Sequence, residues 1–503
     1  MSAGYSAARV GVMAVSSRKN TASDTKYRLW NGVSTTTNSE KRVLYGRTVI
    51  YSSETDITRE NLIDVLDKAT HVHEKNRGEI EYLYNYYRGK QPILNKDKKH
   101  RPEINNKIVE NHAYEIVEFK KGHWFGEPVQ YVRRGESAKE NLIPLLNEFM
   151  FLADKAKKDK ELIEWSLIGG TAYRLIVPDA YYPDVPFVID TLDPRSTFVV
   201  YNNGTGKRPL MGVKYIKTAD DNILYSVYTK DYYYEVIDGK IVNIKPHALG
   251  CIPIIEYPAN SARMGAFEVV LPILDALNDT ISFRLDGIEQ FIQAFVKFVN
   301  CELDKEQFES LKELGAILVK SNNGAQADVD IISQELDQSQ TQITKDDLYQ
   351  TMLIICGMPD RHQNSKSTSD TGQAVLLRDG WGSAEARAKD FADIFKSSEK
   401  EFLRIVLRIL RGINGLDIDL SEVDIKLTRN KTDNLLVKTQ GLQNMLEAGV
   451  HPKIAFYTCN LFGDPEQVYL DSEPYLQKWL KAEANITPAN NKPNPEGDAI
   501  EGS

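Results

Sequence analysis

Apolar and polar residues alternate in a series of short stretches between residues 129 and 260. Proline, glycine and Asn-Gly turns separate these stretches, and a period of two residues is typical of half-buried β-strands. The pairs Asn203-Gly204 and Asp238-Gly239 are the clearest hairpin signals, because both contain residues that tolerate positive φ. The pattern predicts a β-rich subdomain in this part of the chain.

A period of three to four residues replaces this alternation on both sides of the β-rich region. It predicts a pair of helices that ends at Gly89, helices around 138–168, and further helical segments over 434–484. A short strand over 424–430 precedes the last of these segments. Helices and strands therefore follow one another in blocks, which indicates an α+β fold.

The segment 373–411 is the longest stretch with helical periodicity and predicts one long helix that stops at Gly412. Gly380 and Gly382 flank Trp381 in this helix. Because glycine weakens a helix by about 1 kcal/mol, we expect a bend at this point.

The segment 264–290 predicts a helix with two different faces. Apolar residues recur on one face at helical spacing, namely Val270, Ile273, Leu274, Leu277, Ile281, Leu285, Ile288 and Phe291. Acidic residues occupy another side, namely Asp275, Asp279, Asp286 and Glu289. Two short strands, 294–300 and 315–320, then flank a helical piece, and a returning helix covers 339–355. Two helices joined by a compact insertion form a projecting stalk, and its apolar stripe implies packing against other copies.

The stretch KKGHWFGEPVQYV, residues 120–132, joins a helical region to the first alternating strand. We expect Gly122 to end a helix, and Trp124 and Phe125 to fill the space between helical and β layers. Gly126 and Pro128 would then turn the chain into the first strand. Ordinary core packing, with no special role in assembly, is the alternative interpretation of the two rings.

The composition is that of a folded protein, with 42% hydrophobic and 26% charged residues among 503. No run approaches the ~20 apolar residues that cross a bilayer, so we expect no membrane contact. The net charge of −9 argues against a tight general DNA binder, which usually needs a basic face. Residues 1–53 and 485–503 are polar and aperiodic. The first segment is predicted to be a disordered arm and the second a disordered tail.

Catalytic and metal-binding motifs are the next question. The sequence holds no phosphate-binding loop, HExxH or GxSxG motif, and its four cysteines form no CxxC pair. The histidines of the HVH triplet at 71–73 fall in a helical region, which disfavours a metal pair. The acid pairs Asp190 with Asp193, and Asp328 with Asp330, suit magnesium, but turn capping and solvation are the simpler interpretation. We expect no cofactor, no metal and no catalysis.

Two polar loops remain. The basic loop 95–107 admits either a phosphate contact or simple solvation. Residues 356–372 show no apolar periodicity and are rich in Ser, Asn, Thr and Gly, which is typical of a mobile loop.

Four stretches in this order resemble the portal proteins of tailed bacteriophages, in particular those of long-tailed phages of Gram-positive hosts. They are YNYYRGKQPI, KKGHWFGEPVQYV, the acid-striped helix from residue 264, and SDTGQAVLLRDGWGSAEARAK. The resemblance covers residues 54–480 and implies a ring, usually of about twelve subunits, at one vertex of the viral head. A terminase motor would pump double-stranded DNA in through this ring, and the DNA would later leave the same way.

The resemblance also implies a division of the chain. It predicts a wing (54–263), two stem helices (264–290 and 339–355), a clip (291–338), a tunnel loop (356–372), a long bent helix of the wing (373–411), a connector (412–433) and a crown (434–484). The DNA-proximal residues of the tunnel loop would be Arg361, His362, Asn364, Lys366 and Ser367. Implied partners are the terminase, a head-tail adaptor, and the major capsid and scaffolding proteins, with assembly in the host cytoplasm and a final place in the virion.

Several alternatives stay open at this point. The acidic residues of the first stem helix face either the channel or basic residues of a neighbouring subunit. A second interpretation is that the chain is a metal-dependent DNA-processing enzyme, which would use Asp190, Asp193, Asp328 or Asp330. A head-tail adaptor is a third, although adaptors are usually far shorter than 503 residues.

Overall fold

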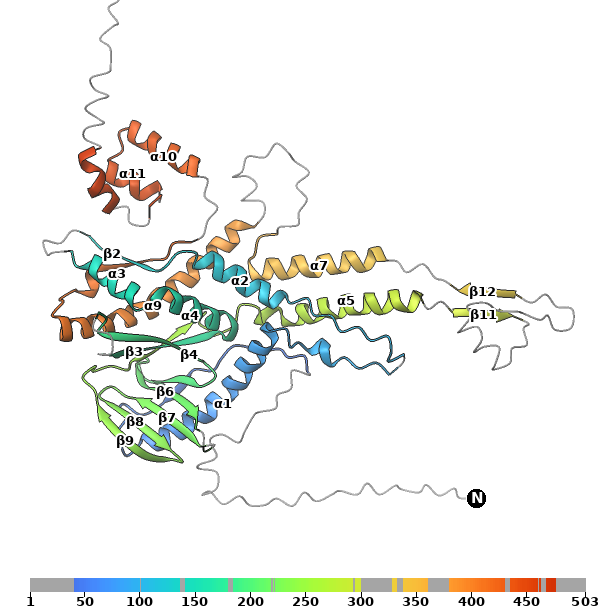
Figure 1. Ribbon diagram of the computed structural model, residues 1–503, viewed down its shortest axis with the longest axis horizontal. Helices are drawn as coiled ribbons and strands as arrows, with labels where there is room; N and C mark the ends of the chain where they lie inside the picture. The colour runs from blue at the N-terminus through green and yellow to red at the C-terminus, as the bar shows by residue number, and fades with distance from the viewer. Residues whose placement is uncertain are drawn as a thin grey trace, which may run out of the picture. The chain divides into compact units, whose positions relative to one another are not determined.

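A computed structural model of the chain is shown in Figure 1. It describes residues 40–99, 101–135, 141–179, 184–218, 220, 222–292, 295–299, 328–332, 338–360, 380–429, 435–459, 461–462 and 467–475. The chain divides into two compact units. The larger comprises Met1–Gly122 and Glu148–Leu420, and the smaller comprises His123–Asn147 and Ser421–Ser503.

A six-stranded sheet forms one part of the larger unit, in the order β1-β5-β6-β7-β8-β9. Its strands are β1 (Ile50–Ser52), β5 (Thr197–Asn202), β6 (Pro209–Lys217), β7 (Ile223–Tyr228), β8 (Tyr232–Ile237) and β9 (Lys240–Pro246). All pairings are antiparallel except that of β1 with β5. Helix α1 (Leu62–Tyr87) supplies Leu62, Val65 and Leu66 to the apolar core on one face of this sheet. Most of the strands predicted from the alternating pattern therefore lie in this sheet.

The two hairpin signals in this sheet have different outcomes. Asp238 and Gly239 join β8 to β9 and both have positive φ, 48° and 68°, as a tight turn requires. At the other signal, β5 ends at Asn202 and β6 begins only at Pro209, so the connection is a longer loop. β5 and β6 still pair antiparallel, so the hairpin is confirmed, but positive φ falls in its loop on Gly206 and Lys207 rather than on Asn203-Gly204.

The disordered arm predicted over residues 1–53 is wrong for its last part. Residues 40–53 are described, and β1 within them adds a parallel strand to the sheet. The buried Arg47 anchors the segment through ion pairs with Glu79 and Glu268, both at 2.9 Å. These partners lie far along the sequence, so composition alone could not reveal them. Residues 1–39 lie outside the described residues.

A three-stranded sheet, in the order β10-β3-β4, packs against helices of the same unit. Its strands are β3 (Thr171–Pro178), β4 (Phe187–Leu192) and β10 (Ile254–Pro258), and the helices that contact it are α4 (Lys155–Gly169) and α9 (Trp381–Asn414). A charged group is buried where these elements meet. Its members are Lys155, Asp159, Arg174, Tyr257 and Glu399, and we call them the Arg174 network.

Three helix boundaries differ from the predictions. Residues 62–87 form one continuous helix rather than a pair, since Gly78 inside it does not interrupt the hydrogen bonding. Helix α9 starts after Gly380, whose φ of 83° lies outside the helical region, so the predicted bend coincides with the described start of the helix. The same helix passes Gly412 and ends before Gly415, which has a φ of 67°.

Two helices and a strand pair follow the three-stranded sheet. Helix α5 (Leu271–Ile292) and helix α7 (Gln338–Cys356) pack against each other, and Figure 1 shows them side by side. Between them in sequence, β11 (Phe295–Val299) pairs antiparallel with β12 (Asp328–Ile332). The second strand of the insertion was predicted over 315–320, which lies outside the described residues, and β12 was not predicted.

The smaller unit contains a second two-stranded sheet. Strand β2 (Gln130–Arg133) pairs antiparallel with β13 (Val423–Lys426). The prediction that residues 129–133 open the β-rich subdomain is therefore wrong, because their partner is nearly 300 residues away.

The remaining described helices of the chain are α2 (His112–Trp124), α3 (Ile143–Leu152), α10 (Leu435–Glu447) and α11 (Pro452–Cys459), and residues 467–475 are also helical.

Candidate functional site: the α5–α7 helix pair and its anchoring segment

Helix α5 buries one polar face against its own chain. Asp275, Asn278, Ser282 and Asp286 recur at intervals of three and four residues, and all four are at most 4% exposed. The segment 104–111 lies along this face without regular secondary structure, and we call it the anchoring segment. Its backbone amides of Asn106, Ile108 and Glu110 donate to Asp286, Ser282 and Asn278 at 2.7, 3.0 and 2.8 Å. Buried amides need acceptors, and the helix side chains supply them.

Asp286 has the richest set of contacts on this face. Lys96 and Lys98 form ion pairs with its Oδ2 at 2.7 and 3.3 Å, and Asn106 donates to Oδ1. Burial alone would raise the pKa of this carboxyl, but the bonds from Lys96 and Asn106 lower it to about 2. The carboxylate is therefore charged at neutral pH. The basic loop thus neutralises an aspartate of its own chain, an interpretation that the sequence did not suggest.

The other acidic residues of α5 have different surroundings. Asp275 accepts a hydrogen bond from the Tyr86 hydroxyl at 2.9 Å, and burial raises its pKa. Asp279 is partly exposed and forms an ion pair with Lys41, whereas Glu289 is exposed. The hypothesis that the whole stripe faces either a channel or a neighbouring subunit is therefore wrong for Asp275 and Asp286. Their partners come from the same chain.

Large apolar side chains remain exposed on the helix pair. Phe283 of α5 is 56% exposed, and Ile343 and Ile354 of α7 are 60% and 73% exposed. Phe283 also lies under the Lys96 ammonium, 4.3 Å from the ring centroid. Apolar surface of this kind on a projecting element is typical of contacts with another protein or another copy.

A second polar cluster joins α7 to the start of α2. His112 lies between Glu115 and Glu110, with nitrogen to oxygen distances of 2.8 and 3.4 Å. Lys345 of α7 forms an ion pair with Glu110 at 2.5 Å, and the Tyr349 hydroxyl of α7 donates to Glu115 at 2.9 Å. Burial lowers the pKa of His112, but the two carboxylates outweigh it and raise the pKa to about 9. The imidazole is therefore a cation at neutral pH and belongs to a charged junction.

The predicted tunnel loop is described only at its start. Cys356 and Met358 are buried at the end of α7, and Asp360 is the last described residue before the gap. The predicted DNA-proximal residues Arg361, His362, Asn364, Lys366 and Ser367 all lie outside the described residues.

The aromatic motif is buried as expected, with Trp124 9% and Phe125 4% exposed. Gly122, however, lies inside α2, which ends only at Trp124, so the prediction that this glycine ends the helix is wrong. Gly126 and Pro128 follow in the connection to β2. The two rings therefore lie at the C-terminal end of α2, with Trp124 as its last residue and Phe125 directly after it.

The aspartates of the enzymatic alternative have other partners. Asp193 binds Arg195 at 2.6 Å, and Asp190 binds Lys158 at 3.3 Å. Asp328 and Asp330 lie in strand β12, opposite Val299 and Lys297. Within the described part of the chain, no group of three histidine, cysteine or acidic residues is arranged to hold a metal ion.

The triplet HVH does not form a site either. His71 is exposed, whereas His73 is buried and stacks on Phe198 with 4.6 Å between ring centroids. Burial lowers the pKa of His73 to about 4, so it is neutral at physiological pH. Two positions apart on a helix, the side chains point to different sides.

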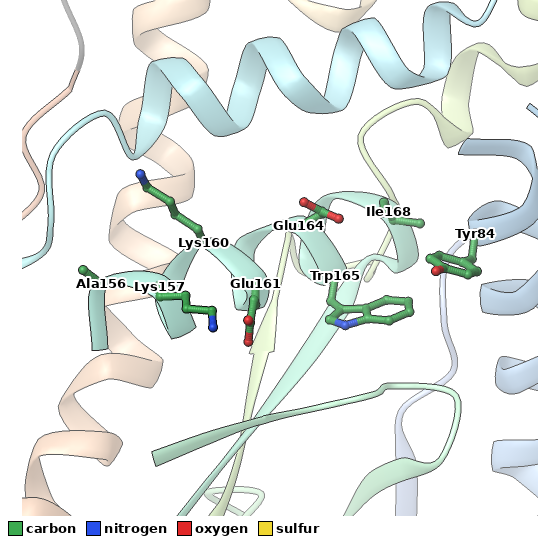
Figure 2. Close-up of a pocket in the computed structure, with 8 residues that line it drawn as sticks. All are labelled: Tyr84, Ala156, Lys157, Lys160, Glu161, Glu164, Trp165 and Ile168. Atoms are coloured by element: carbon green, nitrogen blue, oxygen red, sulfur yellow. The ribbon is translucent and has the colours of Figure 1, made fainter. Parts of the chain in front are cut away.

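The cavity in Figure 2, of about 590 Å³, lies along the outer face of α4. Trp165 points toward Tyr84, and the two rings stack with 5.0 Å between centroids. The two carboxylates of this cavity are paired, Glu164 with Lys121 at 2.8 Å and Glu161 with Lys158 at 3.6 Å. The lining of this pocket thus consists of paired charges and stacked rings. None of its lining residues is a nucleophile with a base beside it.

Comparison with known families identifies the chain. The family model described as phage portal protein, SPP1 Gp6-like, matches residues 66–466. This chain belongs to that family of phage portal proteins. The match includes α5, α7 and everything between them, and the family is a structural one.

Two further findings complete the comparison. No curated protein matches the sequence. Among the described helices of this portal family member, none combines the length and hydrophobicity that crossing a membrane requires.

Proposed function

We propose that this chain is the subunit of a portal ring, the head-tail connector at one vertex of the capsid. About twelve copies close around a channel through which a terminase packages double-stranded DNA, and the genome leaves by the same route. The observation that supports this best is the family match over residues 66–466. The paired helices α5 and α7 would form the stem, the segment with β11 and β12 the clip, and residues 434–484 the crown.

The burial of Asp275 and Asp286 changes which acids we assign to the channel. Glu289 of α5 and Asp346 and Asp347 of α7 are exposed on the helix pair. Exposed carboxylates repel phosphate and would let a duplex slide without being held. We also assign transient DNA contacts to Arg361 and Lys366 of the segment 356–372.

The ring itself is tested by negative-stain electron microscopy of the purified chain. We expect annular particles with a central hole wide enough for duplex DNA. A protein that stays monomeric at high concentration, and shows no hole in any assembled form, would contradict the proposal.

The channel assignment is tested by charge reversal in a packaging assay that measures DNase-protected DNA. The variant Glu289→Lys/Asp347→Lys should assemble intact rings and package more slowly, because the new cations attract phosphate. Glu60→Lys/Asp64→Lys is the matched control, since it makes the same charge change at exposed positions around the start of α1. Failure of the first variant to form rings would place its two residues at subunit contacts instead.

A further inference from the structure

A groove of about 620 Å³ lies between α9 and one face of the six-stranded sheet. Val49 and Tyr51 around β1, and Val199 and Tyr201 on β5, line the sheet side of this groove. Ile50 and Val200, which alternate with them, point to the opposite face and join the core beneath α1. Strand periodicity therefore leaves a second face of the sheet for the groove.

Cationic side chains outnumber acidic ones along the groove, which we call the basic groove. Arg404 and Arg408 come from α9, Lys207 and Arg208 from the β5–β6 loop, and Arg263 from the segment after β10. Against these five cations stand two carboxylates, Glu256 and Glu401, which leaves an excess of three positive charges. The whole chain has a net charge of −9, so this local excess opposes the overall balance.

The cations of the basic groove differ in how far they are satisfied. Arg263 forms an ion pair with Glu256 at 2.6 Å, and Arg404 pairs with Glu401. Arg408 donates to the carbonyl oxygen of Leu249. Among the described residues, neither Arg408 nor the exposed Lys207 and Arg208 has a carboxylate partner. The groove therefore presents donors on both rims that an anionic group would satisfy.

The floor of the basic groove is apolar. Ile252, Ile254 and Val199 belong to a buried cluster that includes Tyr173 and Leu192. Ile405 of α9 closes the floor between the two arginines of that helix. A floor of this kind accepts aliphatic side chains, which bury apolar area there at about 25 cal/mol per Å².

The combination of an apolar floor and basic rims distinguishes between classes of ligand. Nucleic acid has a phosphate about every 1.7 Å of duplex and no aliphatic side chains for the floor. A peptide in which acidic and aliphatic residues alternate satisfies both surfaces at once.

We propose that the basic groove is a docking site for a short acidic peptide segment of a partner protein. The carboxylates of the segment bind Arg404, Arg408 and Lys207, and its aliphatic side chains lie on Ile254 and Ile405. All residues of the basic groove belong to the larger unit. Failure of this proposal would therefore not contradict the proposed channel, and failure of the channel would not contradict this proposal.

Fluorescence anisotropy with the full chain tests this site. The probe is a fluorescein-labelled peptide with the sequence Glu-Leu-Asp-Val-Glu-Leu-Asp. Two comparison peptides replace either its acids by Lys or its aliphatic residues by Ser. We expect the acidic aliphatic peptide to bind, and each comparison peptide to bind about tenfold more weakly or not at all.

Charge reversal in the groove separates docking from general stickiness. Arg404→Glu/Arg408→Glu should weaken binding of the acidic probe about tenfold and strengthen binding of the Lys peptide. Lys157→Glu/Lys160→Glu is the matched control, because it reverses two exposed cations of the cavity on α4 and should leave probe binding unchanged. Circular dichroism melting verifies that both variants fold.

Four results would overturn the proposal. They are no binding of the acidic probe, equal binding of the Ser peptide, probe binding that survives the groove reversal, and displacement of the probe by a duplex oligonucleotide that itself binds the groove. If instead the wild type binds no peptide and the groove variant loses its oligomeric state, the occupant is a second copy and the proposal fails.

Discussion

Two groups of buried polar residues hold the larger unit together, and they do so in different ways. The Arg174 network joins α4, β3, β10 and α9, which already have regular hydrogen bonding and apolar contacts of their own. The polar face of α5 binds the anchoring segment, which has no regular secondary structure. In the first group, charges connect elements that are already formed. In the second group, side chains of α5 accept the hydrogen bonds that backbone amides of the anchoring segment would otherwise form within a strand or a helix.

This difference predicts different consequences of damage. The members of the Arg174 network are at most 4% exposed, and Phe402 lies within 5.3 Å of both of its cations. Loss of one charge there leaves a net charge buried and uncompensated, which destabilises the larger unit as a whole. Loss of a contact on α5 should release the anchoring segment locally, because water can then reach it.

The largest effect is expected for Glu399→Ala, which removes a partner from both Lys155 and Arg174. We expect the free energy of unfolding of the larger unit to fall by about 3 to 5 kcal/mol. Urea denaturation followed by circular dichroism measures it. Glu401→Ala is the control on the same helix, because its exposed pair with Arg404 contributes about 0 to 1 kcal/mol. Equal losses in the two variants would refute the distinction.

Asp286→Ala should have a smaller and more local effect. Removal of the carboxylate deprives Lys96 and the Asn106 amide of their acceptor, at about 2 to 3 kcal/mol. We expect trypsin to cleave after Lys96 and Lys98 much faster, while the main unfolding transition moves little. Glu289→Ala, the exposed control on the same helix, should leave the cleavage rate unchanged.

Acid should release the anchoring segment in the wild type. The pKa of Asp286 is lowered to about 2, below the value of about 3.9 in an unfolded chain. Its contribution is therefore present above pH ~4 and is lost as the pH falls through about 2. Faster hydrogen exchange of residues 104–111 over this interval would show the release, and Asp286→Ala should exchange fast at every pH.

His112 gives a pH dependence of opposite sign and intermediate size. Its pKa is raised to about 9, so its contribution is present below the unfolded value of about 6.5 and is lost as the pH rises through 9. Melting temperatures of the wild type should therefore fall over this interval relative to His112→Gln. The exposed His71→Gln serves as the control, and a parallel fall in both variants would argue against the junction.

Ser282→Ala should have the smallest effect of the series. It removes one neutral acceptor from the Ile108 amide and should cost about 1 kcal/mol, measured by urea denaturation. A loss as large as that of Glu399→Ala would mean that the anchoring segment belongs to the same cooperative unit as the Arg174 network.

Local patterns in the sequence predicted much of the fold. The alternating stretches gave β3 to β10, and the period of 3.6 residues gave α5, α7 and most of α9. The Asp238-Gly239 turn was predictable because positive φ is a property of the residues themselves. The burial of Trp124 and Phe125 was likewise expected from their size and position.

Partners distant in sequence could not be predicted in this way. The pairing of β2 with β13, the parallel addition of β1 and the pairing of β11 with β12 depend on which segments meet in space. The signal that came nearest was the basic loop, since Lys96 and Lys98 already suggested an anionic contact. Its nature, an aspartate 190 residues away, was not visible.

The sequence by itself determined that the chain alternates between helical and β-rich blocks, and its motifs were sufficient for its family to be inferred. Only the tertiary structure decided what the polar side chains of those blocks do. Asp275 and Asp286 have the helical spacing of a solvated stripe, yet both are buried. The reason is that a periodic pattern records which residues share a face, whereas the burial of that face depends on the backbone amides and cations that distant segments bring to it.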